Sequence, residues 1–393
     1  MYLFIILIAT ELLTPAVIWQ RFRSKSKPLF YLALLIHIAL SIWLWILFIE
    51  IKIYSGPFDS PDNVWNLMLL TGMASAVTLP RTILILAHFV GKFLRRKTGG
   101  YINWLTNTGV VISSAIFIII AAGTLFGRFN VKVDNVEIGI KGLHDDIDGL
   151  KIAQISDLHL ASFYHHKKEL SVMMDRINDL APDLFINTGD FVSYGWREFD
   201  GFDTILSKAN GRYGSFAVLG NHDFGIYHPH FTEADREDNT LRIEQMARSS
   251  GYVVLNDGHT VITIGNAKIG IIGVSTIGRH PNIYHGDIDS AMHGLDSVDL
   301  KLALSHDPNH YTLSIEGKTD IDITLSGHTH GMQMGIMTKS FKWSPSKYLY
   351  PHWNGLFSNN GQHHYVNRGL GSLAIPFRIW MPPEITLITL RKE

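Results

Sequence analysis

Two chemically reactive side chains, Asp157 and His159, follow a short apolar run in the stretch IAQISDLHLAS (Ile152–Ser162). Where a chain is extended, side chains at positions i and i+2 point to the same face, so this carboxylate and this imidazole are directed to one point. Oxygen and nitrogen donors placed in this way are suited to binding a metal ion. A single D-x-H pair also occurs in loop caps, so the rest of the chain has to decide between the two interpretations.

Four further apolar runs also end in acidic, carboxamide or imidazole side chains. Such runs predict buried strands, and helical patterns between them, at 166–180, 203–210 and 237–250, predict an α/β layered fold. Ligand sites in these folds form beyond the carboxyl ends of the strands, so the five runs predict one common site. The runs and the side chains that follow them are Lys151–Ile155 (Asp157, His159), Leu184–Asn187 (Asp190), Phe216–Leu219 (Asn221, His222, Asp223), Lys301–Leu304 (His306) and Ile321–Leu325 (His328, His330).

Seven of these side chains are potential metal ligands. One metal ion needs about four to six donors, so seven donors and a solvent molecule suit two ions that share a bridging carboxylate. The chain has no cysteine, which excludes disulfides and thiolate ligands. A mixed nitrogen and oxygen set favours Mn, Fe, Zn or Co over Mg or Ca. The predicted metal ligands are Asp157, His159, Asp190, Asn221, His306, His328 and His330.

The ordered motifs DLH, GD, GNHD, H and GHTH, over about residues 151–331, resemble those of the calcineurin-like metallophosphoesterase superfamily. The resemblance implies an αββα sandwich and a dinuclear centre whose metal-bridging hydroxide attacks a phosphoester or pyrophosphate bond. It also implies that His222 is a catalytic, non-ligand histidine near the scissile phosphate and that Asp223 orients it. By the same resemblance, the first metal is held by Asp157, His159 and His330, the second is completed by Asn221, His306 and His328, and Asp190 bridges the two.

The regions that flank these motifs carry a second resemblance. A multi-pass N-terminus, the lead-in VDNVEIGIKGL and the tail YVNRGLGS…PPEITLITL are similar to bacterial transmembrane proteins with a metallophosphoesterase domain. That group also resembles enzymes that hydrolyse UDP-diacylglucosamine in lipid A synthesis. The lead-in itself predicts an edge strand or hairpin. Met332, in GHTHGMQ, stands where many relatives have a second glycine; it is not a ligand, so this departure concerns substrate fit.

The sequence predicts a transmembrane domain at 1–128 and a metallophosphoesterase domain at 129–393. Residues 1–128 contain 11 lysines and arginines but only 4 acidic residues, whereas the remainder holds 18 of the 20 histidines. Four apolar stretches are each long enough to cross a hydrocarbon core of about 30 Å. These four predicted helices cover about residues 1–20, 30–48, 64–94 and 104–126.

The third apolar stretch is interrupted at Pro80-Arg81, which predicts either one kinked helix or a short re-entrant pair. Arg81 lies near mid-depth, where a charge needs a partner or a function. Glu11 is the expected partner, and contact with a lipid phosphate is the alternative interpretation.

The distribution of basic residues predicts which side of the cell membrane each loop occupies. Loops 21–29 and 92–100 are basic, whereas loop 51–62 contains one lysine and two aspartates. Lysine and arginine concentrate on the cytoplasmic side, so the pattern places both basic loops inside and the metallophosphoesterase domain outside. This expectation requires four membrane crossings. If the third stretch does not form a single crossing, the metallophosphoesterase domain lies on the opposite side.

Several features near the motifs leave two interpretations open. The aromatic segment Ser340–Phe357 is typical either of a packed cap or of an amphipathic surface at the bilayer interface. Arg368 is expected to contact either a substrate phosphate or a local carboxylate. Further histidines are expected to be solvated loop residues, two of them (His228 and His230) close enough to GNHD to border the site: His165, His166, His228, His230, His363 and His364.

Three functions are compatible with these patterns. The first is a membrane-anchored phosphohydrolase that acts outside the cytoplasm on a lipid-linked or envelope phosphate, in lipid metabolism. The second is a cytoplasm-facing pyrophosphatase of the UDP-diacylglucosamine type, and the third is a non-catalytic membrane sensor or scaffold. The expected partners are a phosphorylated substrate and the bilayer. Nucleic acid is not expected, because the chain has no basic stripe outside the membrane flanks.

Overall fold

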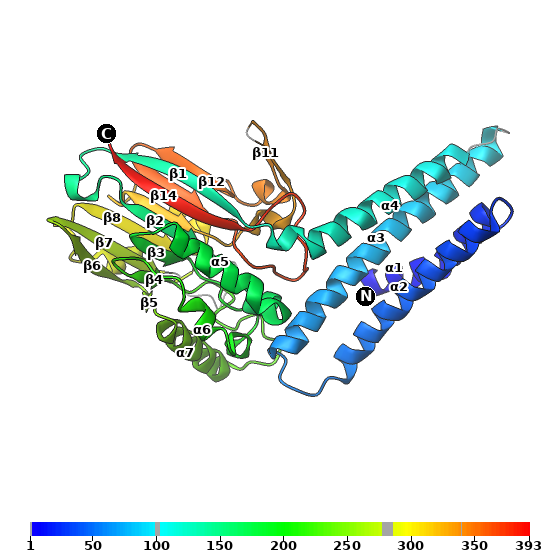
Figure 1. Cartoon of the computed structure of the whole chain (residues 1–393), viewed down its shortest axis with the longest axis horizontal. Helices are drawn as coiled ribbons and strands as arrows, with labels where there is room; N and C mark the ends of the chain where they lie inside the picture. Colours follow the sequence, from blue (N-terminus) through cyan, green and yellow to red (C-terminus); the bar gives the residue numbers. More distant parts are fainter. Residues whose placement is uncertain (1, 99–102, 277–285, 339) are drawn as a thin grey trace. The chain divides into compact units, whose positions relative to one another are not determined.

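The computed structural model describes residues 2–98, 103–276, 286–338 and 340–393, and divides the chain into two compact units (Figure 1). The helical unit comprises Met1–Gly56, Asn66–Phe126 and Ala374–Phe377. The sheet unit comprises Pro57–Trp65, Gly127–Leu373 and Arg378–Glu393. The sheet unit thus includes a short segment from the N-terminal part of the chain, Pro57–Trp65, and the helical unit includes one from the C-terminal part, Ala374–Phe377. The end of the predicted basic loop 92–100, at 99–100, lies outside the described residues.

Four long apolar helices form most of the helical unit, as the sequence predicted. Each is long and apolar enough to cross a membrane. Pro80 lies inside one continuous helix, which confirms the single-helix interpretation of the third stretch and not the re-entrant pair. The helices are α1 (Tyr2–Phe22), α2 (Lys27–Ile53), α3 (Pro61–Thr98) and α4 (Asn103–Leu125).

The charge expected at mid-depth in the membrane is paired. Arg81 Nη1 lies 2.5 Å from Glu11 Oε1, and Arg81 Nη2 donates hydrogen bonds to the His37 carbonyl and the Ser41 hydroxyl. The second carboxylate oxygen of Glu11 accepts a hydrogen bond from Ser41. Because the pair joins α1, α2 and α3 and satisfies both charges, the structural role expected for Arg81 is confirmed.

Two six-stranded sheets form the sheet unit. The first has the order β1-β14-β2-β3-β4-β5, with β2 to β5 parallel. The second has the order β12-β13-β9-β8-β7-β6, with β13 to β7 parallel. The first sheet contains β1 (Lys132–Ile140), β2 (Lys151–Ile155), β3 (Leu184–Asn187), β4 (Ser215–Ala217), β5 (Val253–Val254) and β14 (Glu384–Lys392). The second contains β6 (Gly258–Ile264), β7 (Ala267–Val274), β8 (Leu300–Ser305), β9 (Ile323–Ser326), β12 (Gly355–Asn359) and β13 (Gln362–Val366).

The two sheets pack face to face and are covered by helices, which gives the predicted αββα layers. Alternate residues of β2 face opposite sides: Ile152 joins the core between the sheets, and Ala153 joins the core under the helices. Helices α5 (Lys167–Asp179), α6 (Asp203–Leu206) and α7 (Glu233–Ser249) cover the first sheet. Helix α8 (Ile288–Met292) and the turn at Tyr311–Ile315, which follows α9 (Pro308–His310), cover the second.

Strand β1 lies at the edge of the first sheet and pairs with β14, which confirms the edge strand predicted for the lead-in. The central strands β3, β8 and β9 are parallel to both neighbours, and β2 is parallel to β3 and antiparallel to β14. All four are buried on both faces, apart from the exposed first residue of β2. Their carboxyl ends therefore deliver the following loops to one edge of each sheet.

The connection between α2 and α3 is built into the sheet unit. Asp59 is fully buried and lies 3.0 Å from the guanidinium of Arg197. Trp65, in the first turn of α3, packs under the guanidinium of Arg128, which follows α4. Within the sheet unit, these contacts join the chain that leads into α3 to the chain that follows α4.

Some expectations for individual polar residues are corrected or decided by the fold. His228 and His364 are buried, not solvated: His228 stacks on Phe231, and His364 hydrogen bonds Ser326 Oγ at 3.0 Å. Arg368 is also buried and pairs with two carboxylates, those of Asp134 and Glu384, so the local-carboxylate interpretation holds. Loop position alone did not reveal that other segments cover these side chains.

Candidate metal centre

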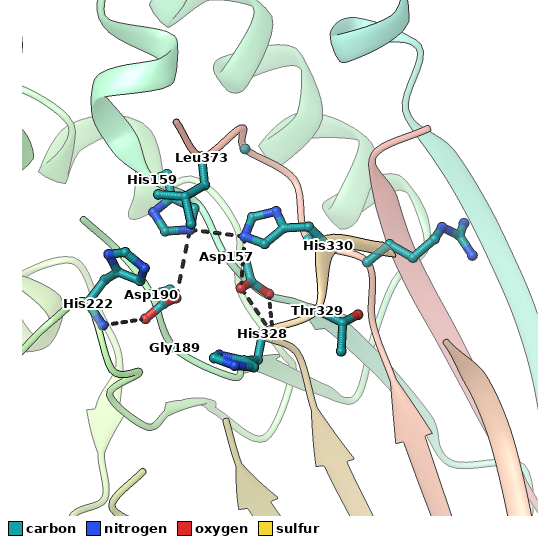
Figure 2. Close-up of polar contacts among 12 residues, drawn as sticks. Asp157, His159, Gly189, Asp190, His222, His328, Thr329, His330 and Leu373 are labelled. Atoms are coloured by element: carbon teal, nitrogen blue, oxygen red, sulfur yellow. Dashed lines mark hydrogen bonds and ion pairs between the residues drawn. The ribbon is translucent and has the colours of Figure 1, made fainter. Parts of the chain in front are cut away.

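Two groups of side chains converge beyond the carboxyl ends of the strands. Within each group the potential ligand atoms all lie within 4.8 Å of one another. The structure therefore brings together six of the seven predicted ligands in the two sets that the family resemblance implied. The first group is Asp157, His159 and His330, and the second is Asp190, His306 and His328. Figure 2 shows the first group together with Asp190 and His328 of the second.

The first group is buried and directed to a single point. His159 Nε2 lies 3.0 Å from His330 Nε2, which in turn lies 3.2 Å from Asp157 Oδ1. Figure 2 shows the two imidazoles directed toward each other above the carboxylate. Two imidazole nitrogens at this separation and one carboxylate oxygen form a donor set suited to a borderline divalent metal ion.

Asp190 lies between the two groups. Its Oδ2 atom is 3.1 Å from His306 Nε2 in the second group and 3.7 Å from His159 Nε2 in the first. Asn221, the seventh predicted ligand, joins the second group because its Oδ1 lies 2.8 Å from His328 Nδ1. One carboxylate oxygen within reach of both groups is the arrangement that a bridging ligand requires.

Tight loop conformations present these ligands. Five of the six grouped residues have positive φ values between 41° and 72°, a region that L-residues rarely occupy and that costs about 1–3 kcal/mol each. The loops also approach one another closely: a Cβ on Gly189 would lie 2.5 Å from the Gly220 nitrogen, and one on Gly327 would lie 2.4 Å from Asp157 Oδ2. The glycines of the motifs are therefore needed for close approach at both positions.

The imidazoles are oriented so that one nitrogen is free for a metal. His306 Nδ1 donates to the Thr188 carbonyl at 2.7 Å, and His159 Nδ1 donates to the Val192 carbonyl at 3.1 Å. A proton held on Nδ1 by a backbone carbonyl leaves the Nε2 lone pair available, as is usual for histidines that bind a metal through Nε2. The residues present therefore fit a pair of divalent cations.

The electrostatics of the group also favour bound cations. Burial opposes a charge on His306, but the carboxylate of Asp190 outweighs it and raises the pKa of His306 to about 10. Burial likewise opposes ionisation of Asp157, but the charge of His330 outweighs it and holds the pKa of Asp157 below its usual range. Buried carboxylates that stay ionised need neighbouring positive charge, which a proton or a metal ion supplies.

His222 lies beside the first group without being part of either set. Its backbone nitrogen donates to Asp190 Oδ1, and its ring centroid is 5.1 Å from that of His159. The ring Nδ1 donates to the Ser193 carbonyl at 2.6 Å, which leaves Nε2 as the atom available for proton exchange. The half-buried ring is thus fixed in orientation at the edge of the centre.

The carboxylate of Asp223 accepts hydrogen bonds from backbone nitrogens and does not contact the His222 ring. It accepts hydrogen bonds from the backbone nitrogens of Asp190 and Gly220, both at 2.9 Å, and of Val192 at 3.1 Å. The expectation that Asp223 contacts and orients the His222 ring is therefore corrected. The Ser193 carbonyl holds the ring, and Asp223 instead fixes the loops that carry Asp190 and His222.

Three residues that surround the centre were not found from sequence. Tyr350 Oη lies 2.8 Å from His328 Nε2, and Tyr227 Oη accepts a hydrogen bond from Asn221 Nδ2 at 3.0 Å. Glu198 accepts backbone hydrogen bonds from 193–195, and burial raises its pKa to about 7. None of the three belongs to the motifs that carry the predicted ligands; Glu198 and Tyr227 act within their own loops, and Tyr350 contacts a ligand 22 residues away.

Tyr350 leads to a testable prediction about the second group. When His328 binds a metal through Nδ1, its Nε2 proton is held by Tyr350, so Tyr350→Phe is expected to weaken the second metal site about tenfold. Calorimetric titration of the metal-free protein with Mn²⁺ measures this change. Tyr348→Phe, at an exposed tyrosine nearby, is the matched control. Unchanged affinity for two Mn²⁺ ions in Tyr350→Phe would contradict the prediction.

Comparison with known proteins agrees with this geometry. Residues 150–332 match the calcineurin-like phosphoesterase family. The uncharacterized metallophosphoesterase YkuE of Bacillus subtilis is 28% identical over 247 residues, which cover 62% of this chain and 80% of that protein. A transmembrane protein with metallophosphoesterase domain from Danio rerio is 28% identical over 292 residues, covering 70% of this chain and 62% of its own. The protein of the same name from Bos taurus is 25% identical and is covered over 57% of its length. The match therefore spans less than two thirds of these two transmembrane relatives.

Proposed function

Because this chain belongs to the calcineurin-like metallophosphoesterases, we propose that it is a membrane-anchored phosphohydrolase. The proposed substrate is a phosphoester or pyrophosphate carried on a lipid or another envelope molecule. The metal ligands are the seven predicted side chains, and Mn, Fe, Zn or Co are the ions that their donor atoms favour. Two such ions, when bound, lower the pKa of a water molecule and neutralise phosphoryl charge.

The protein side chains supply positioning and proton transfer in this proposal. Asp190, between the two groups, holds them at a fixed separation. His222 Nε2, left free by the bond from Nδ1 to Ser193, delivers a proton to the leaving oxygen or stabilises the charge that develops there. No covalent bond between substrate and protein is required.

The observation that supports a membrane-borne substrate is the short chain between α2 and the centre. Helix α2 ends at Ile53, and the ring of Phe58 lies 5.1 Å from that of Tyr194. Five residues span at most about 18 Å. Tyr194 directly follows Ser193, whose carbonyl holds His222. One side of the centre is therefore tethered near the end of a membrane span.

We propose that the sheet unit lies outside the cytoplasm. The segment Pro57–Trp65 and the chain from Gly127 onward belong to one unit, so both are on the same side of the membrane. The basic loop 21–29 and the basic end of α3 then lie on the opposite, cytoplasmic side. A reporter enzyme that is active only outside the cytoplasm, fused after Glu393, is expected to be active. Activity only of a cytoplasmic reporter at this position would contradict the proposal and favour the UDP-diacylglucosamine type.

The substrate class is tested by comparing cells that contain the wild-type chain with cells that contain Asp190→Asn. A phosphorylated lipid is expected to accumulate in the variant, in the lipid extract and not among soluble phosphometabolites. Accumulation of a soluble phosphate compound instead would contradict the lipid-linked substrate. Failure of the purified wild-type protein to hydrolyse either p-nitrophenyl phosphate or its bis-ester with any of the four metals would favour the sensor or scaffold.

A further inference from the structure

A group of exposed apolar side chains lies on the segments that follow the last metal ligand. Five of them are between 43% and 71% exposed. Single exposed apolar residues are ordinary, but a group of them marks an interaction surface. We name this group the aromatic face; it consists of Ile336, Phe341, Tyr348, Leu349 and Trp380.

The aromatic face is one continuous piece of structure. Strand β10 (Ile336–Met337) pairs with β11 (Lys342–Trp343), and the Trp343 indole donates to Tyr348 Oη. The residue before β10, Gly335, donates its backbone hydrogen bond to Ile379, which precedes Trp380. The β10–β11 hairpin is drawn in orange beside the β11 label in Figure 1. Backbone pairing therefore holds Trp380 next to the hairpin.

The loop that carries Trp380 is closed at its base beside the metal centre. Arg378 is buried and donates from Nη2 to the Gly371 carbonyl at 2.7 Å and to the Gly369 carbonyl at 3.1 Å. The same Nη2 lies 3.3 Å from Nδ1 of the metal ligand His330. The chain between Gly371 and Arg378 thus forms a loop whose base is fixed near the first metal group.

The tip of this loop belongs to the helical unit. Ala374–Phe377 are part of that unit, where Thr71 of α3 donates a hydrogen bond to the Ala374 carbonyl and Gly72 faces Pro376. Gly72 has no side chain, and a Cβ there would lie 2.7 Å from Pro376 Cδ. The absence of a side chain at Gly72 therefore allows the loop tip to pack directly against the helix backbone.

The depth of this tip follows from the length of α3. Its candidate membrane span, Pro61–Arg96, has 36 residues. At 1.5 Å per residue it is about 54 Å long, so a hydrocarbon core of about 30 Å centred on it covers about residues 69–88. Thr71 and Gly72 then lie at the boundary of the hydrocarbon core. Trp380 is four residues beyond Pro376, which faces Gly72 at that boundary, and so lies within about 14 Å of Pro376.

The composition of the aromatic face fits this depth. Tryptophan and tyrosine are favoured at the level of the lipid headgroups, where an apolar ring meets water. Lys342 and Lys347 are exposed in the same segments and supply positive charge for lipid phosphates. We infer that the aromatic face lies in the headgroup region of the bilayer, on the side of the membrane that holds the metal centre.

This placement goes beyond the proposed hydrolysis and is independent of it. It applies the interfacial interpretation to the exposed side chains of Ser340–Phe357, whereas buried residues of the same segment, such as Ser344 and Ser346, pack as in a cap. It also gives a reason for the position of Arg378, which connects the membrane-facing loop to His330.

The absence of cysteine makes the placement directly testable in the full-length chain. Phe341→Cys, Tyr348→Cys and Trp380→Cys are each labelled with an environment-sensitive fluorophore in nanodiscs of phosphatidylethanolamine and phosphatidylglycerol. Leu241→Cys and Leu313→Cys, on α7 and on the turn after α9, are the exposed controls. Lipids with a nitroxide near the headgroup are expected to quench the three test labels at least about threefold more than the controls, because interfacial side chains penetrate about 5–10 Å.

Two results would overturn the placement. Quenching of the three test labels no stronger than at Leu241→Cys would show that the face is in water. A blue-shifted emission without lipid quenching would show that a protein, such as a second copy of the chain, covers the face. Retention of the wild-type Mn²⁺ stoichiometry identifies folded variants, and the three separate positions keep the test valid if one variant misfolds. The readout needs no turnover, so its result is separate from that of the hydrolysis assays.

Discussion

Asp190→Asn is expected to lower phosphoesterase turnover by at least about 1,000-fold and to reduce metal binding. Asp190 Oδ2 lies within 3.7 Å of imidazoles from both groups. Asparagine has nearly the same shape but no negative charge, so the two cations lose the anionic ligand between them. Turnover of bis-p-nitrophenyl phosphate in Mn²⁺ and the metal content per chain measure the two effects.

Asp183→Asn is the matched control for this change. Asp183 Oδ2 accepts a hydrogen bond from the Lys151 nitrogen at the start of β2, the end of the strand away from the ligands. The same substitution there is expected to leave turnover within about twofold, because surface changes away from special features are usually small. Full metal occupancy together with normal turnover in Asp190→Asn would show that Asp190 does not bridge the two groups.

His222→Ala is expected to lower kcat by about 100- to 10,000-fold while both metals remain bound. The ring belongs to neither metal group, and its Nδ1 proton is committed to Ser193. If His222 protonates the leaving oxygen, the loss is larger for an alkyl phosphodiester than for a p-nitrophenyl ester, whose leaving group needs no proton. Paired assays with the two substrates and metal analysis of the variant test both parts.

The control for His222→Ala is His293→Ala, an exposed histidine outside both metal groups. It is expected to leave kcat and the metal content unchanged. Loss of metal from His222→Ala in proportion to its loss of activity would contradict a proton-transfer role and make His222 a ligand or a structural residue. An equal loss of kcat for both leaving groups would contradict protonation of the leaving oxygen.

The sequence by itself determined the four long helices, the strands that carry the ligands and the chemical type of the site. Strands β2 and β3 begin and end where the sequence predicted, because strands buried on both faces appear as short, mostly apolar runs. The four long helices were predicted for a similar reason, since a membrane span must be apolar over its whole length. Donor types and their order after each strand were sufficient to predict a two-metal site.

The tertiary structure decided which residues support that site and how it is attached. Ser193 rather than Asp223 holds His222, Tyr350 contacts His328, and Arg378 contacts His330. The tertiary structure also decided that Pro57–Trp65 belongs to the sheet unit and that Ala374–Phe377 belongs to the helical unit. The physical reason is that periodicity and turn chemistry record only what a residue does within its own element. Contacts between segments tens to hundreds of residues apart leave no such local signal, and these contacts fix the ligand orientations and the depth of the aromatic face.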